Sequence, residues 1–349
     1  MYALDTNVLY YLTGLSTYPS AVNSSRLVKL IDGGECCVTS TSFFEFICNK
    51  KNGVKELRDL IELFIKHDIK VANVTLEPLP EWFEWDIDSI DDGMLDDLRT
   101  FAVNNKIELE SKYACAQLTV CVLLGLYFYL DWQLKGDWSV AGIACFMRKC
   151  TSLNESLVKN VFVEGYASND CERCVKRNLE SILGEELATG IAVMEAVEQH
   201  DGEQDFNIVK WVESTEFNLS FCRAKGLIAH SQSAYDFLRK LASHYKTNHG
   251  EDAYRSFLDG VYDIFKGKAQ TAELGDCLRR TMKRIVEDGG KYRKNDLLDA
   301  LILSVIDQVD AVITFDSGFR KIIEGMANEN DKYARSVSLI ASLEGDSSS

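Results

Sequence analysis

Two short apolar runs at opposite ends of the chain constrain its fold more than any other feature. Tyr2–Leu4 is followed at once by Asp5, and Ala311–Phe315 is followed at once by Asp316. Short apolar runs that lead into helix-like segments are typical of strands buried on both faces of a parallel sheet. We therefore expect the two ends of the chain to meet in one sheet, which carries the long middle as an insertion.

Neighbouring segments continue an alternation of strands and helices, which is the signature of a parallel α/β sheet. Further strands are predicted at Cys36–Val38, Val71–Val74 and Val337–Ile340. Helices are predicted at Thr6–Thr13, from Pro19 to Ile31, from Ser40 to Ile47, at Val54–His67, at Asp296–Gln308 and at Ser317–Met326. The fold class predicted for both ends of the chain is α/β with a parallel sheet.

Residues 77–290 have a different character, because helical patterns dominate there and strand signals are few. The change begins at the Glu77-Pro78-Leu79-Pro80 segment, and the α/β pattern resumes after Gly290. We therefore predict an α/β domain in two parts, 1–76 and 291–345, interrupted by a mostly α-helical insertion at 77–290. Such an insertion is compatible with folding because chain termini often lie close together.

The most apolar stretch of the insertion, Tyr113–Leu130, has the minimum length of a membrane span. It contains Gln117 and Thr119 and lacks flanking basic clusters, which favours a buried helix. The chain starts with a strand-like run and holds eleven cysteines, an odd number, which favours a cytoplasmic protein with reduced thiols and no membrane contact. Cys171 and Cys174 are half of a zinc site at most, because no second CxxC pair follows.

Four or five acidic residues are predicted to converge at one edge of the sheet. Asp5 and Asp316 follow two strands, whose carboxyl ends form the ligand crevice of an open parallel sheet. Glu45 lies in the helix after the second strand, while Asp296 and Asp299 share one face of another helix. Carboxylates so close repel one another, and Mg²⁺ or Mn²⁺ relieves that repulsion through oxygen ligands. Two such ions roughly 3.5–4 Å apart can activate a water molecule for phosphodiester hydrolysis.

Each acid also has a structural interpretation. Asp5, Asp296 and Asp316 are suited to cap the helices that follow them. Glu45 could be an ordinary exposed helix residue. Taken singly these interpretations are favoured, because helix caps are common. The metal-site interpretation is supported when the acids are considered together, since all of them fall at the functional edge of one sheet.

The same residues resemble the PIN-domain nucleases. The resemblance is carried by four features in order, namely Leu4-Asp5-Thr6-Asn7-Val8-Leu9, Glu45 after the second strand, Asn295-Asp296-Leu297-Leu298-Asp299-Ala300-Leu301-Ile302, and Ile313-Thr314-Phe315-Asp316-x-x-Phe319. It covers roughly residues 1–75 and 290–345 and implies a three-layer α/β/α sandwich. It also implies a Mg²⁺- or Mn²⁺-dependent ribonuclease, and many members are toxins of bacterial toxin–antitoxin pairs. The small toxins lack an insertion like that at 77–290.

The resemblance also assigns roles to individual residues. Metal binding and catalysis are assigned to Asp5, Glu45, Asp299 and Asp316. Asp296 is a further candidate metal ligand, and either it or Asp299 would be the main third acid. Residues that would hydrogen-bond to these acids are Asn7, Thr6 and Thr314.

A basic segment precedes the last part of the chain, although the net charge of the protein is −16. Between Lys266 and Lys294 there are nine basic residues and four acids. Candidate substrate-binding residues in it are Arg279, Arg280, Lys283, Arg284, Lys291, Arg293 and Lys294. A surface that guides phosphates to the acids and an ordinary solvated helix face are equally compatible with this pattern.

Two Arg–His spacings, Arg223 with His230 and Arg239 with His244, resemble the short motif of the metal-independent HEPN ribonucleases. Neither has the polar residue that usually follows the arginine in that motif. We therefore expect all four to be helix-surface residues.

The function predicted from these observations is a metal-dependent nuclease that hydrolyses phosphodiester bonds. An endoribonuclease acting on single-stranded or structured RNA is expected, with Mg²⁺ or Mn²⁺ as its cofactor. The alternative is a catalytically weak PIN scaffold whose helical insertion binds a protein or RNA partner, such as an antitoxin or a component of an antiphage system.

Overall fold

The computed structural model describes residues 1–19, 21–33, 36–73, 86–133, 140–150, 153–168, 171–200, 206–266, 272–290, 293, 295–328 and 331–344. The chain splits into two compact units. The sheet unit comprises residues 1–106 and 297–349, and the helical unit comprises residues 107–296. Because the two units are distinct, each is described by itself.

The sheet unit contains four parallel strands in the order β3-β2-β1-β4. They are β1 (Tyr2–Leu4), β2 (Cys36–Thr39), β3 (Lys70–Ala72) and β4 (Ala311–Ile313). Tyr2 lies opposite Cys36 on one side and opposite Ala311 on the other. The predicted pairing of the two ends of the chain in one parallel sheet is therefore confirmed.

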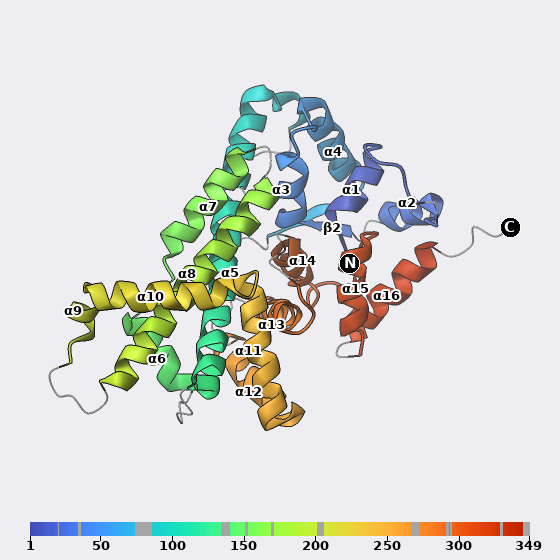
Figure 1. The fold of residues 1–349 in the computed structure, drawn as a ribbon. Coiled ribbons are helices and arrows are strands. Elements are labelled where there is room, and N and C mark those ends of the chain that lie inside the picture. The colour runs from blue at the N-terminus through green and yellow to red at the C-terminus, as the bar shows by residue number, and fades with distance from the viewer. Residues whose placement is uncertain are drawn as a thin grey trace. The chain divides into compact units, whose positions relative to one another are not determined.

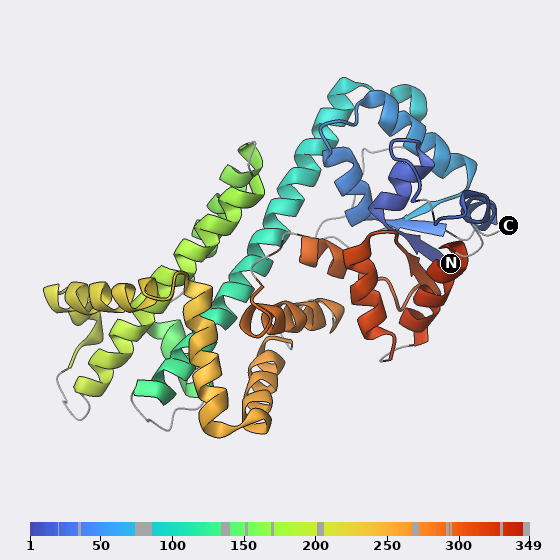
Figure 2. The same ribbon diagram turned by 45° about the vertical axis from the view of Figure 1, so that its right-hand side comes forward.

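Helices cover both faces of this sheet. On one face Leu4 and Val38 pack against α1 (Thr6–Leu12), α2 (Ser24–Asp32), α3 (Ser40–Cys48) and α4 (Val54–Lys66). On the other face Ala3, Cys37 and Val312 pack against α14 (Asn295–Leu303), α15 (Ser317–Met326) and α16 (Asp331–Glu344). Figure 2 shows the strands between the blue N-terminal helices and the red C-terminal helices. Although α/β in this sense, the part of the chain that the structure describes is mostly helical, at 77%.

One helix start differs from its prediction, and in both of the following helices the N-cap precedes the first helical residue. The helix expected from Pro19 begins at Ser24, since the Asn23 side chain accepts a hydrogen bond from the backbone N–H of Arg26. The helix expected from Ser40 does begin there, but its N-cap is Thr39, the last residue of β2. Helix α14 ends at Leu303, five residues before the predicted end at Gln308.

The predicted last strand at Val337–Ile340 is wrong, because these residues lie within α16. The buried residues of α16 are Tyr333, Ser336, Ile340 and Leu343, which follow one another at intervals of three and four. That spacing places them on one face of a helix. A short apolar run fits a strand and a helix equally well, so the run itself could not decide between them.

The first boundary between the units lies later than the sequence placed it, at Lys106 rather than at residue 76. The cause is α5 (Asp92–Gln133), which follows the short 3₁₀ helix η1 (Ile87–Ser89). Leu95, Leu98 and Ala102 of α5 belong to the core of the sheet unit. One helix is thus shared by both units. The second boundary falls between Asp296 and Leu297, inside α14.

The helical unit is built around the second half of α5 (Figure 1). Its other helices are α6 (Val140–Cys150), α7 (Glu155–Ala167), α8 (Cys171–Gln199), α9 (Ile208–Val212), α10 (Thr215–Ala229), α11 (Ala234–His249), α12 (Glu251–Lys266) and α13 (Ala272–Val286). Within the described ranges, α5 alone is long and apolar enough to cross a membrane, and 83% of its most apolar window is buried.

Close contact between α5 and α8 depends on two glycines. A Cβ atom at Gly125 of α5 would lie 2.6 Å from Cδ2 of Leu187, and one at Gly190 of α8 would lie 2.7 Å from Cδ1 of Leu126. Real Cβ atoms do not come so close to a neighbour. Each glycine therefore gives space to a leucine of the facing helix.

Candidate functional site

Three acids come from elements that begin at the carboxyl end of the sheet. Asp5 follows β1 and caps α1, and Asp316 follows β4 and caps α15. Glu45 lies in the middle of α3, the helix that follows β2. Strands β2, β1 and β4 are neighbours in the sheet. The order of the strands therefore brings together residues that are up to 311 positions apart in the chain.

The side chain of Asp5 is almost completely buried, with 5% exposed. Its Oδ1 accepts a hydrogen bond of 2.6 Å from the backbone N–H of Thr6. Its Oδ2 accepts one of 2.7 Å from the hydroxyl of Thr314. The first contact lies at the N-cap of α1 but comes from the first N–H of the helix, whereas a capping side chain usually binds the second or third. The second contact crosses from β1 to the end of β4, and a helix cap has no need of it.

Thr6 connects Asp5 to the second acid. While its backbone N–H donates to Asp5, its hydroxyl donates to Oε2 of Glu45 over 2.6 Å. Thr6 is buried and Glu45 is partly buried. Since one residue contacts both carboxylates, their separation is limited by the size of a threonine.

Thr314 connects Asp5 to the third acid. Its hydroxyl oxygen accepts from the backbone N–H of Asp316 at 3.1 Å and from the Asn7 amide at 3.4 Å. The other end of the Asn7 amide accepts from the backbone N–H of Phe315 at 3.2 Å. Asp316 is exposed, and its Oδ1 accepts two bonds of 2.8 Å from the backbone of α15. These bonds hold the turn after β4 against the start of α1.

The pKa of Asp5 is raised from its ordinary value of 3.8 to about 7. Burial is the main cause, and the negative charges of Glu45 and Asp316 raise it further. The hydrogen bonds from Thr314 and Thr6 oppose this effect without cancelling it. Asp5 thus lies within the electrostatic reach of both other acids. A positive ion beside it would favour its charged form.

The donor atoms of these three residues are all carboxylate oxygens, which suit Mg²⁺ or Mn²⁺. Each carboxylate oxygen has two lone pairs, so the hydrogen bonds to Asp5 leave capacity for a metal ion. Among the residues that the structure describes, however, no group of three or more His, Cys, Asp or Glu side chains is arranged to hold a metal ion. The chemistry of the set fits a hard cation, but a complete ligand cage is not formed.

Asp296 and Asp299 fall on different sides of the boundary between the units. Asp296 ends the helical unit, and its carboxylate pairs with Arg284 and accepts a hydrogen bond of 3.4 Å from Thr281. This ion pair gives Asp296 a structural role within the helical unit. Asp299 belongs to the sheet unit and is half-buried on α14. Of the two, Asp299 is therefore the better candidate for a site with Asp5.

Three of the seven candidate phosphate-binding residues in the basic segment have acidic partners. Arg279 pairs with Asp259, Lys283 lies 4.0 Å from Glu287, and Arg284 pairs with Asp296 as above. Arg293 is exposed. Lys268, Lys291 and Lys294 lie outside the described residues. These ion pairs favour a structural role for much of α13.

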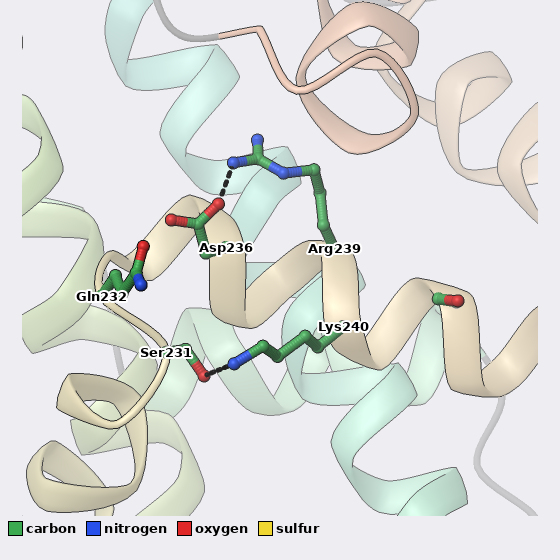
Figure 3. Close-up of a pocket in the computed structure, with 6 residues that line it drawn as sticks. Ser231, Gln232, Asp236, Arg239 and Lys240 are labelled. Atoms are coloured by element: carbon green, nitrogen blue, oxygen red, sulfur yellow. Dashed lines mark hydrogen bonds and ion pairs between the residues drawn. The ribbon is translucent and has the colours of Figure 1, made fainter.

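A pocket of about 370 Å³ in the helical unit is lined by polar residues at the start of α11 (Figure 3). Arg239 pairs with Asp236 and also donates to the backbone carbonyls of Ile285 and Gly290, at 3.1 and 3.3 Å. Lys240 donates to the hydroxyl of Ser231 at 3.2 Å. Arg239 therefore holds α11 to the end of α13, and Lys240 holds α11 to the turn that precedes it.

The partners of Arg223, Arg239 and His244 are residues outside the two Arg–His motifs. Arg223 pairs with Glu195, and Arg239 has the partners just described. His244 shares a hydrogen bond of 2.9 Å with Asn248. The contacts of Arg223 and His244 are ones that a helix surface commonly makes, whereas Arg239 also binds the end of α13.

Two residues beside the acids were not predicted from the sequence. Tyr10 lies one turn after Thr6 on α1, and Asn49 lies one turn after Glu45 at the end of α3. The Asn49 amide donates to the Tyr10 hydroxyl at 3.0 Å. Their spacing of four from residues of the site is a helical period that could have identified them.

Comparisons of this chain with protein-family models, with curated proteins and with solved structures find no match. The geometry of the acids therefore carries the functional argument.

Proposed function

We propose that this protein is a PIN-type, metal-dependent endoribonuclease that hydrolyses phosphodiester bonds in RNA. One observation carries the proposal: burial and the charges of Glu45 and Asp316 raise the pKa of Asp5, and threonines tie it to both acids. Burying one carboxylate beside two others costs free energy. Such an arrangement persists where a bound cation offsets that cost and where function requires it.

Asp5, Glu45 and Asp316 would hold Mg²⁺ or Mn²⁺, with Asp299 as a fourth ligand from α14. The bound ions would supply an activated water molecule and neutralise charge on the phosphate. Thr6 and Thr314 keep Asp5 in place through two hydrogen bonds of 2.6 and 2.7 Å. Asn7 holds the turn that carries Asp316. These residues orient the ligands and do not themselves touch the substrate.

RNA would approach over exposed cations of the sheet unit. Lys50, Lys51 and Lys55 are exposed around the end of α3 and the start of α4, the region that follows Glu45. They attract phosphates without recognising the base sequence. With a net charge of −16, such a local group is needed to bind a polyanion.

The test is a cleavage assay on the full chain with single-stranded RNA, structured RNA and single-stranded DNA in Mg²⁺, Mn²⁺ or EDTA. Wild type is expected to cut RNA only with a metal ion, and Asp5→Asn and Asp316→Asn are expected to lower kcat by at least about a hundredfold. Asp59→Asn, an exposed acid of α4, is the matched control and should cut like wild type. Full activity of Asp316→Asn would refute the assignment.

A second candidate is a scaffold whose helical unit binds a protein or RNA partner. It is favoured by four exposed apolar residues of that unit, Leu157 and Val163 on α7, Val209 on α9 and Leu219 on α10. Val209 and Leu219 are each 69% exposed. The same assay separates the two candidates, because a scaffold would neither cut RNA nor bind Mn²⁺ saturably.

A further inference from the structure

A pocket of about 250 Å³ opens in the sheet unit between the end of α1 and the end of α3. It is lined by Tyr10, Leu15, Ser16, Asn49, Lys51 and Asn52. The lining combines an aromatic ring, an apolar side chain, two amides, a hydroxyl and an ammonium group. Its volume is below the roughly 300–1,000 Å³ of pockets for larger ligands, so it suits a ligand of about one ring system.

This pocket lies beside the acids. Tyr10 is one helical turn from Thr6, and Asn49 is one turn from Glu45, whose carboxylate Thr6 binds. The negative charge of Glu45 also contributes to the raised pKa of Tyr10, after burial and the opposing hydrogen bond from Asn49. A charge effect of this kind falls off with distance, which places the Tyr10 hydroxyl within reach of the Glu45 carboxylate.

The polar walls of the pocket are held in place. The Tyr10 ring is stacked on Phe46, with ring centroids 5.3 Å apart and planes 26° apart. The Asn49 amide donates to the Tyr10 hydroxyl and accepts from the backbone N–H of Lys51 at 3.1 Å. Asn52 is 4% exposed and donates to the carbonyl of Phe46 at 2.8 Å. A ligand would thus meet groups whose orientation is already set, which lowers the entropy cost of binding.

The Tyr10 hydroxyl can act as a hydrogen-bond donor as well as an acceptor. A phenol has one hydrogen to donate and also accepts hydrogen bonds, and Tyr10 uses its oxygen to accept from Asn49. Asn52 also hydrogen-bonds to this hydroxyl, so an acceptor on a ligand would join or replace a contact with an amide. Leu15, 39% exposed, supplies an apolar surface, and exposed Lys51 supplies a positive charge at the rim. An acceptor-bearing planar ring joined to a phosphate matches this combination.

We propose that this pocket is a subsite for one nucleotide of a single-stranded nucleic acid, with the base against Tyr10 and Leu15 and a phosphate at Lys51. The inference rests on the proposed nuclease function, because the pocket would fix which phosphodiester bond reaches the acids next to Glu45. It assigns to Tyr10 and Lys51 a role in substrate positioning and base preference.

The test measures binding of the four nucleoside 5′-monophosphates, and of inorganic phosphate, to the full chain in EDTA, by calorimetry and ligand-observed NMR. Wild type is expected to bind at least one nucleotide more tightly than inorganic phosphate. Lys51→Ala should weaken that binding about tenfold, the effect of losing one charge-assisted hydrogen bond. Tyr10→Phe, which keeps the stacked ring, should weaken it several-fold and reduce the preference among bases.

The matched control is Lys66→Ala, since Lys66 is an exposed lysine on the last turn of α4 that does not line the pocket. It should leave nucleotide affinity unchanged. Equal affinities of wild type and Lys51→Ala, tighter binding of inorganic phosphate than of every nucleotide, or no nucleotide binding at millimolar concentration would overturn the proposal.

Failure of this inference and failure of the nuclease proposal give different results. Binding in EDTA needs neither a metal ion nor cleavage, so nucleotide binding that depends on Lys51 supports the subsite even in a protein that cuts nothing. If RNA is cut but the nucleotides do not bind, the subsite is refuted and the nuclease stands. For an active nuclease, Lys51→Ala should raise KM about tenfold and leave kcat nearly unchanged.

Discussion

The hydroxyl of Thr314 donates a 2.7 Å hydrogen bond to the carboxylate of Asp5, which lies 309 positions earlier in the chain. The two residues follow neighbouring parallel strands, and both are buried. Thr314 thus favours the charged form of an acid at the other end of the chain, against the larger effect of burial, which raises the pKa of Asp5. Contacts between distant parts of the chain, this hydrogen bond among them, lead to four predictions.

Asp5 should make the stability of the metal-free protein depend on pH. Its pKa is about 7 in the folded state and near 3.8 when exposed, so between these values the folded protein holds a proton that the unfolded chain has lost. Stability should therefore fall as the pH rises through this range, by at most about 1.4 kcal/mol per pH unit. Asp5→Asn should make this slope shallower and melt at a higher temperature than wild type at pH 8.

The measurement is thermal unfolding in EDTA at several pH values from 4.5 to 8, with Asp59→Asn as the charge-matched control. Identical slopes for wild type and Asp5→Asn would show that Asp5 is not the responsible group. Addition of Mn²⁺ at pH 8 should raise the melting temperature of wild type and leave that of Asp5→Asn almost unchanged, because a bound cation offsets the charge on Asp5.

Replacing Thr314 by valine or by serine should separate the contribution of its volume to stability from that of its hydroxyl. Thr314→Val keeps the volume but leaves Asp5 without one donor and the backbone N–H of Asp316 without its acceptor. The expected loss is about 1–3 kcal/mol of unfolding free energy, together with a further rise in the pKa of Asp5. Thr314→Ser retains the hydroxyl and should lose much less. Urea unfolding of the three proteins tests this, and equal stabilities would argue that the hydroxyl is dispensable.

Asp296 should matter for stability and not for metal binding. Its pKa is raised by burial, while the charges of Arg284 and Arg293 oppose that rise. Arg284→Met would leave the carboxylate without its ion-pair partner, at a cost of about 2–3 kcal/mol. Asp296→Asn should unfold at lower urea concentration than wild type yet bind Mn²⁺ with unchanged affinity. A large loss of Mn²⁺ affinity in Asp296→Asn would instead make it a ligand.

The glycines between α5 and α8 should tolerate no larger side chain. Gly125→Val and Gly190→Val would push against Leu187 and Leu126, and each should cost about 1–3 kcal/mol through overpacking. Gly226→Ala on α10, where a Cβ would meet nothing within 4 Å, is the control. It should stabilise the helical unit by about 0.5–1 kcal/mol. Calorimetry of the full chain measures these changes, and a neutral Gly190→Val would show that the helices can separate there.

Local patterns in the sequence predicted much of the sheet unit. The runs at Tyr2–Leu4 and Cys36–Val38 are apolar and short, and both became buried strands. The run at Val337–Ile340 looked similar but lies in a helix, because its neighbours Ser336 and Leu343 complete a face of period 3.6 that packs on the sheet. Apolar content could identify the buried residues but not the element that buries them.

The boundary of the helical unit is a second feature that local patterns in the sequence did not locate. The prolines at 78 and 80 marked a change of composition, but the first turns of α5 still pack into the core of the sheet unit through Leu95 and Leu98. Composition reports where a pattern changes along the chain. Which core a helix joins depends on three-dimensional contacts that composition does not contain.

The sequence by itself determined the parallel strands at both ends of the chain and the acids that follow them, because strand propensity and helix capping act over a few residues. Only the tertiary structure decided that Asp5 is buried, that Thr6 joins it to Glu45, and that Asp296 pairs with Arg284. Burial and ion pairing depend on segments that meet across more than 300 positions of the chain. The ionisation of a carboxylate, and with it the chemistry of this site, is therefore a property of the folded protein.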